Sequence, residues 1–185
     1  MIVAILLLLT AFSAQAQEPL AANLDQVART ATAMVDGDVA RGIQTQRSVE
    51  MMLKVNPRDN WAAADNYDVD HGAYVATKKT LIRLSRLCST ACDVNLWLPV
   101  TGKPDRVHVV IRNVHEMSQF WKWGDLDQPM PAEMKAVLET GRRQTVRLRE
   151  TMVSVLAPVY DSLGDVVGLV EVVASTRPNA QENVQ

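Results

Sequence analysis

The residues of this sequence best suited to chemistry are aromatic, histidine and arginine side chains in its second half. Ligand pockets are mostly apolar, with a few polar groups that fix the orientation of the ligand. Tryptophan and tyrosine rings form pocket walls, and an arginine binds a carboxylate through two parallel hydrogen bonds. We predict six ligand-binding residues, which are Trp97, His108, Trp121, Trp123, Arg147 and Tyr160.

Several of these residues also have a purely structural interpretation. A tryptophan in a predicted strand, such as Trp97, is more often a core residue than a pocket wall. Arg147 alternates with apolar neighbours, which is typical of the solvated face of a strand. Trp121 and Trp123 are two residues apart in an irregular segment, which brings both rings near one site, and pocket and core fit them equally well.

The sequence contains no recognisable catalytic, metal-binding or cofactor-binding motif. The three histidines, His71, His108 and His115, do not form the His-Glu-x-x-His pair of zinc hydrolases. The nucleophile elbow and the glycine-rich phosphate-binding loops are also absent. Segment 65–70 has the residue types of a calcium loop, but no glutamate stands at its closing position. We therefore predict no catalytic residue, no metal site and no cofactor.

Cys88 and Cys92 are the two cysteines of the chain, and we predict that they form a disulfide. A spacing of four residues places them on one face of a helix, with Cα atoms about 6 Å apart, which a disulfide permits. Disulfides persist in oxidising compartments, and the pair matches neither a zinc nor a haem motif. Free thiols are the alternative.

The first sixteen residues predict a secretory signal peptide. Residues 2–12 are apolar, and Ser13-Ala-Gln-Ala16 supplies the small residues that precede a cleavage site before Gln17. The apolar stretch is too short to span a bilayer comfortably. No Lys or Arg precedes it, and an uncleaved membrane anchor and a buried helix are the alternatives. We therefore predict a periplasmic or secreted protein, with residues 17–23 as a linker.

Length and charge restrict the number of domains and the kinds of partner that we expect. A chain of 185 residues, 48% of them hydrophobic and 22% charged, suits one globular domain. We place this domain at 24–175 and a disordered tail at 176–185. The net charge of −2 leaves no basic surplus for binding a phosphate backbone, so we expect no nucleic-acid partner.

The periodicity of apolar residues predicts an α+β fold. Spacings of three and four residues predict a long helix from Leu24 to about Val55 and a second helix from His71 to Leu87. Alternation at every second residue predicts a five-stranded antiparallel sheet. Its parts are hairpins around 94–111 and 151–174, with a short helix at 129–139 and a strand at 145–148 between them.

The closing hairpin carries a resemblance to a known family. Ala157-Pro-Val-Tyr-Asp161, a short turn with a glycine, and Val166-Val-Gly-Leu-Val-Glu-Val172 resemble the last hairpin of Cache domains, the extracytoplasmic relatives of PAS sensors. The resemblance covers about residues 24–175 and implies a long N-terminal helix before elements in the order β-β-α-β-β-β. It also implies a pocket between the sheet and a connecting segment around 113–127, with small carboxylates and amino acids as ligand classes. The Arg-x-Trp-Tyr arrangement of amino-acid-binding members is absent, and Phe120-Trp-Lys-Trp123 is its nearest counterpart.

These observations lead to two hypotheses about function. The first is an exported, soluble sensor domain that binds a small organic molecule, such as a carboxylate, and signals through a separate membrane receptor or kinase. The second is a structural or interaction protein on the same fold, whose pocket is filled by its own side chains and which forms a homodimer or docks through the long helix. Neither is an enzyme. The sheet face opposite the helix distinguishes them, because it is hollow in the first and filled in the second.

Overall fold

The computed structural model describes residues 19–54, 71–122 and 125–177. The predicted signal peptide, most of the predicted tail and Trp123 lie outside this part of the chain. Within these ranges, no helix is long and apolar enough to cross a membrane.

The long helix predicted from Leu24 to about Val55 is wrong, because the chain divides this region into three helices. They are the N-terminal helix, described over residues 19–34, α2 (Gly37–Gly42) and α3 (Gln46–Lys54). The first of them already includes residues 19–23, which we had predicted as a linker.

Local and tertiary contacts both explain the break before α2. Asp36 is extended, and its carboxylate accepts hydrogen bonds from the backbone N–H groups of Asp38 (2.9 Å) and Val39 (3.1 Å), so that it caps a new helix. At Gly37, an added Cβ would lie 2.3 Å from the carbonyl oxygen of Tyr160. The backbone of α2 therefore touches the closing hairpin, and an uninterrupted helix would not make this contact.

The second predicted helix is present as α4 (His71–Ser85), which buries Thr77, Leu81 and Leu84. The disulfide between Cys88 and Cys92 is confirmed, with a Cα–Cα distance of 6.2 Å. It follows α4 and ends at the first residue of β1, so it joins the helix end to the sheet. A disulfide is consistent with an oxidising compartment.

Six strands form one antiparallel sheet in the order β3-β2-β1-β6-β5-β4, and the prediction of five was therefore wrong in number. The unpredicted strand, β3, has two residues and pairs with Arg106 and Val107 at the edge. The arrangement is compatible with a PAS-like fold. The strands are β1 (Cys92–Val100), β2 (Lys103–Ile111), β3 (Gln128–Pro129), β4 (Gln144–Val146), β5 (Met152–Tyr160) and β6 (Val166–Ser175).

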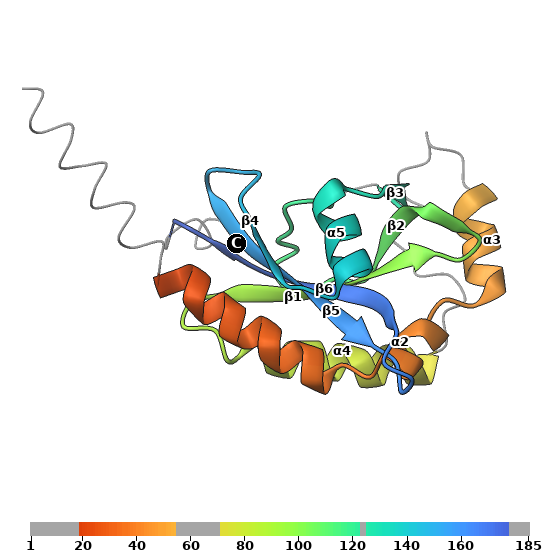
Figure 1. The fold of residues 1–185 in the computed structure, drawn as a ribbon, viewed down its shortest axis with the longest axis horizontal. Helices are drawn as coiled ribbons and strands as arrows, with labels where there is room; N and C mark the ends of the chain where they lie inside the picture. The colour runs from red at the N-terminus through yellow and green to blue at the C-terminus, as the bar shows by residue number, and fades with distance from the viewer. Residues whose placement is uncertain (1–18, 55–70, 123–124, 178–185) are drawn as a thin grey trace, which may run out of the picture.

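Each face of the sheet is covered by a different layer (Figure 1). The N-terminal helix, α2 and α4 lie on one face, where they bury the side chains of Val94, Leu96 and Leu98 from β1. The other face carries α5 (Ala132–Thr140) and the segment that leads to it. Because side chains of a strand alternate between faces, Asp93, Asn95 and Trp97 of the same strand point to this second layer.

Candidate functional site

Five buried residues on the second face of the sheet form what we call the polar floor. The resemblance to Cache domains placed a ligand pocket on this face. Asn95 of β1 and Glu171 of β6 are direct partners across the ladder, and their side chains therefore lie next to each other. The members of the floor are Asp93, Asn95, Trp97, Ser154 and Glu171, all of them buried.

Glu171 is fully buried, and its two carboxylate oxygens accept four hydrogen bonds. One oxygen accepts the backbone N–H of Gln119 (2.8 Å) and the hydroxyl of Ser154 (3.0 Å). The other accepts the indole N–H of Trp97 (3.1 Å) and the hydroxyl of Ser118 (2.6 Å). Burial raises the pKa of Glu171, and these hydrogen bonds act in the opposite direction. All the donors come from the protein itself, which satisfies the carboxylate without a ligand.

Asp93 and Asn95 hold the earlier part of the connecting segment in the same way. The Asp93 carboxylate accepts the backbone N–H groups of His115 (3.2 Å) and Met117 (2.8 Å) and contacts the His115 ring nitrogen Nδ1 at 3.0 Å. The Asn95 side chain accepts the N–H of Asn113 (3.1 Å) and donates to the carbonyl of Met117 (2.7 Å).

Residues 113–121, which we call the flap, are therefore bound to the floor at every second backbone N–H. These N–H groups belong to Asn113, His115, Met117 and Gln119. The flap is not a straight strand, because Val114 and His115 form a turn and Glu116 has a positive φ of 52°. The segment that binds to the floor is therefore the protein's own flap.

The far end of the flap is anchored to the edge of the sheet through Gln119. Its side-chain amide donates to the carbonyl of Val146 (2.5 Å), and its oxygen accepts the N–H groups of Leu148 (2.5 Å) and Arg149 (3.0 Å). Gln119 is buried. One flap residue therefore joins β6 to the connection between β4 and β5.

Trp97, a predicted ligand-binding residue, belongs to the core. Its ring meets Phe120 of the flap edge-on, with centroids 6.3 Å apart, and both pack with Met134 and Val137 of α5. Only 1% of the Trp97 surface is exposed. The structural interpretation of this tryptophan is therefore the one that the geometry favours.

Trp121 is half-buried at the end of the flap. The guanidinium of Arg112 lies 4.1 Å from its ring centroid, a cation–π contact, and its indole N–H donates to the carbonyl of Asp125 (3.1 Å). The predicted neighbour Trp123 lies outside the described residues.

His108 lies on the opposite face of the sheet from Trp97. It pairs with Leu98 in the ladder and therefore points to the helical layer. Its Nε2 atom is enclosed and has no hydrogen-bond partner. Burial lowers the pKa of His108 to about 4, while the carboxylate of Asp127 opposes this shift. The ring is therefore neutral at physiological pH.

The other two predicted residues lie elsewhere. Arg147 is exposed just after β4, and Tyr160 ends β5, with its hydroxyl donating to the carbonyl of Gly141 (3.0 Å) after α5. The five members of the predicted set that the structure describes therefore do not converge on one site. Among the described residues, no cluster of three or more histidine, cysteine, aspartate or glutamate side chains is arranged to hold a metal ion.

The residues that organise this face were not predicted from the sequence, although a signal for them was present. Glu171 is the one charged residue in the apolar run of β6, and Asp93 and Asn95 alternate with apolar Val94 and Leu96. A charged residue inside a fully buried strand requires several hydrogen-bond partners. Such a residue therefore predicts a polar network that lies against the strand.

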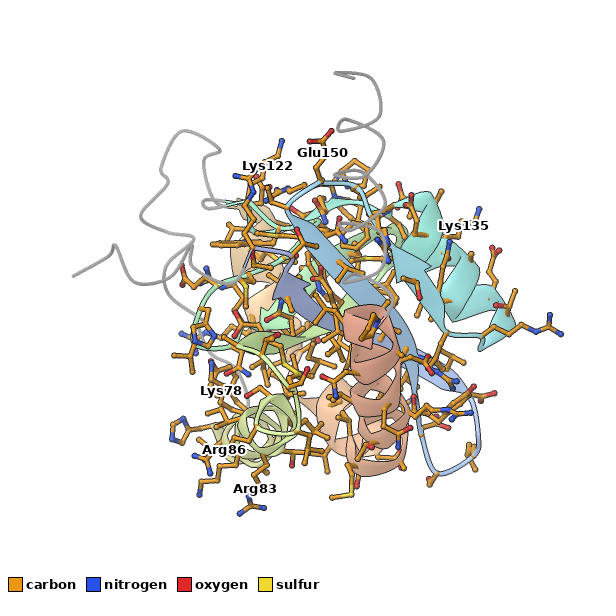
Figure 2. The ribbon with its side chains drawn as sticks, turned by 90° about the vertical axis from the view of Figure 1, so that its left-hand side faces the viewer. Lys78, Arg83, Arg86, Lys122, Lys135 and Glu150 are labelled. Carbon is orange, nitrogen blue, oxygen red and sulfur yellow. A yellow bond between two sulfur atoms is a disulfide. The ribbon has the colours of Figure 1, made fainter. Side chains whose placement is uncertain are left out.

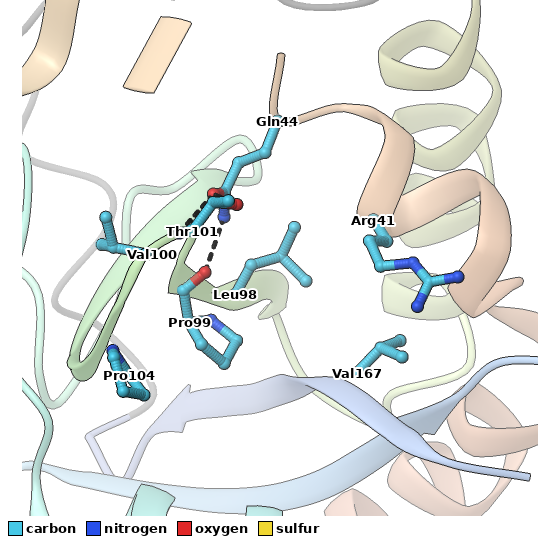
Figure 3. A pocket seen from close by; sticks show the side chains of 9 residues that line it. Arg41, Gln44, Leu98, Pro99, Val100, Thr101, Pro104 and Val167 are labelled. Atoms are coloured by element: carbon cyan, nitrogen blue, oxygen red, sulfur yellow. Dashed lines mark hydrogen bonds between the residues drawn. The ribbon is translucent and has the colours of Figure 1, made fainter. Parts of the chain in front are cut away.

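A groove of about 240 Å³ lies on the helical side, between α2 and the β1–β2 hairpin (Figure 3). Leu98, Pro99 and Val167 make it largely apolar. The side chain of Gln44 closes one end, donating to the carbonyl of Pro99 (2.9 Å) and accepting the N–H of Thr101 (3.1 Å). Typical pockets for drug-sized ligands hold about 300–1,000 Å³, so this groove suits one side chain or a small fragment.

Comparisons with known proteins leave the geometry as the basis for assigning a function. No family model matches the chain, and no curated protein matches it either. The relation to Cache domains therefore stays a prediction. The strand order is compatible with it, while the broken helix and the sixth strand depart from the expected pattern.

Proposed function

We propose that this chain is a non-catalytic interaction domain on a PAS-like scaffold, in which the flap occupies the place of a small-molecule ligand. The observation that carries this proposal is the row of hydrogen bonds from the floor to alternate backbone N–H groups of the flap. A sensor would need this surface for its ligand. The second hypothesis from the sequence was a structural or interaction protein with a filled pocket that dimerises or docks through a long helix. Its filled pocket agrees better with the geometry, while the long helix is divided into three.

The energetics of displacing the flap support the same conclusion. A metabolite on the floor would remove the partners of several buried groups, and each buried group left unpaired costs about 1–3 kcal/mol. A ligand with a dissociation constant of about 1 µM supplies only about 8 kcal/mol of binding free energy. Losing the flap contacts of Glu171 and Asp93 would cancel much of that amount.

The proposal includes export to an oxidising compartment. The signal-peptide pattern of residues 1–16 and the Cys88–Cys92 disulfide support it. In this compartment the domain would act by contact with a protein or a membrane, and it needs no cofactor for that role.

Hydrogen exchange of the flap amides tests the proposal directly. We expect slow exchange at Asn113, His115, Met117 and Gln119, because side chains of the floor hold their N–H groups. The N–H of Glu116 makes no hydrogen bond within the described part of the chain and is the internal control. Exchange at all five sites should be unchanged by small acids and amino acids.

Calorimetric titration with the same panel of small acids and amino acids is the second arm of the test. We expect no binding heat. A compound that binds at micromolar concentration and deprotects the flap amides would overturn the proposal and restore the sensor hypothesis, since it would show that the flap yields to a ligand.

A further inference from the structure

We propose that the exposed basic side of α4 docks this domain on an anionic membrane surface, beside the point where the N-terminal apolar stretch meets the bilayer. The inference rests on the interaction role proposed above and names its partner. It applies to the chain that keeps residues 2–12 as an uncleaved anchor, the alternative to a cleaved signal peptide. It depends on three features: the charge of α4, an exposed apolar side chain at the end of α4, and the position of the N-terminal helix.

All the Lys, Arg, Asp and Glu residues in α4 and in the residues that follow it, up to position 91, are basic. Segment 71–91 contains four Lys or Arg residues and no Asp or Glu, although the net charge of the chain is −2. Lys79, Arg83 and Arg86 are exposed and follow one another at spacings of four and three, which places them on one side of the helix. Figure 2 shows the side chains of Arg83 and Arg86 pointing away from the sheet.

These three cations are not neutralised by the described parts of the chain. No carboxylate there forms an ion pair with Lys79, Arg83 or Arg86. Lys78 differs, because it is half-buried and its ammonium group donates to the carbonyl of Arg112. The docking surface therefore consists of the three exposed cations and not of the whole helix.

An apolar side chain accompanies the cations. Leu87 follows Arg86 directly and is 54% exposed. Basic residues beside an exposed apolar group are typical of surfaces that lie on membranes, where the cations meet lipid headgroups and the apolar group enters the interface.

The position of the N-terminal helix favours a membrane, and not an acidic protein, as the partner. Asn23, near the start of that helix, accepts hydrogen bonds from the N–H (2.8 Å) and the hydroxyl (3.1 Å) of Ser89, just beyond Leu87. The apolar stretch 2–12 is therefore separated from the basic surface by only about ten residues, which reach at most about 35 Å. An apolar segment in the bilayer raises the effective concentration of the basic surface there, and stable attachment takes two such signals.

Vesicle co-sedimentation of the full chain tests the inference. The probes are phosphatidylcholine vesicles with and without about one third phosphatidylglycerol. The readout is the partition coefficient for the anionic vesicles divided by that for the phosphatidylcholine vesicles. The apolar stretch contributes to both coefficients, so its contribution cancels in this ratio. We expect the anionic vesicles to bind more of the protein, and the preference to disappear at about 0.5 M salt.

A charge-neutralising triple variant, Lys79→Gln/Arg83→Gln/Arg86→Gln, should lower this ratio at least about tenfold, since each basic residue near an anionic surface contributes about fivefold. The matched control, Lys103→Gln/Lys135→Gln/Arg142→Gln, removes the same charge from exposed positions outside α4. Lys135 lies across the molecule from α4 in Figure 2. The control should change the ratio less than about twofold.

Three outcomes would overturn the inference. They are equal binding to both kinds of vesicle, equal losses in the two triple variants, and binding to polyglutamate without any preference for anionic vesicles, which would point to an acidic protein. None of them affects the flap exchange and calorimetric results, so failure of this inference is distinguishable from failure of the interaction role.

Discussion

Asn95 and Glu171 face each other across the β1–β6 ladder, and both side chains reach the same flap. Asn95 holds the flap at Asn113 and Met117, and Glu171 holds it at Gln119. Two adjacent strands thus bind consecutive parts of one segment. The pairing register of the sheet and the position of the flap are therefore coupled, because a shift of one strand by one residue would turn its polar group to the other face.

Glu171→Ala should lower the free energy of unfolding by about 2–5 kcal/mol, because it leaves the buried N–H groups of Gln119 and Trp97 without an acceptor. Urea denaturation followed by tryptophan fluorescence measures the change. Glu139→Ala, at a surface position on α5, is the control and should change stability by no more than about 0.5 kcal/mol. A loss below about 1 kcal/mol for Glu171→Ala would show that the flap does not depend on this carboxylate.

Gly37→Ala should destabilise the protein by about 2 kcal/mol or more. The new methyl carbon would lie 2.3 Å from the carbonyl oxygen of Tyr160, so the start of α2 would have to move away from the closing hairpin. Gly42→Ala is the matched control in the same helix, because nothing lies within 4 Å of its added Cβ. It should stabilise by about 0.5–1 kcal/mol, the ordinary gain for alanine in a helix. Thermal denaturation of both variants measures the contrast, and equal effects would contradict the assigned contact.

His108 should make stability depend on pH. Its folded-state pKa is about 4 against an ordinary value of 6.5, so the unfolded chain binds a proton that the folded chain does not. Stability is therefore complete above about pH 6.5 and falls as the pH drops toward about 4, by a total on the order of 3 kcal/mol. Urea denaturation at about pH 7 and pH 5 measures the loss. His108→Gln does not titrate and should lose less stability over this interval, and identical losses would exclude His108 as the cause.

Reduction of the Cys88–Cys92 disulfide should lower stability by about 2 kcal/mol, the chain-entropy value for so short a loop. The melting temperature with and without a reductant measures the change. A Cys88→Ser/Cys92→Ser variant should melt at the reduced protein's temperature and should not respond to the reductant. A response of that variant would mean that the reductant acts somewhere other than on this bond.

Local periodicity was sufficient for much of the fold. The alternation in β1, β2, β5 and β6, the spacing of apolar residues in α4 and the four-residue separation of the cysteines each depend on neighbours in the sequence, and the structure contains all of these elements. Prediction failed at α2, where the apolar spacing continues through Gly37 but the backbone must approach Tyr160. That contact joins segments more than a hundred residues apart, and helical periodicity contains no information about it.

The candidate site depended on tertiary structure even more strongly. The sequence by itself determined that Trp97, Asp93 and Asn95 share one face of a strand and that Glu171 stands alone among apolar residues. Only the folded chain decided that these groups face the flap and not a ligand, because Ser118 and Gln119 supply the hydrogen bonds that a buried carboxylate requires. Side-chain alternation is set by the backbone of one strand, whereas the partner of a buried polar group is set by whatever segment the whole fold brings against it.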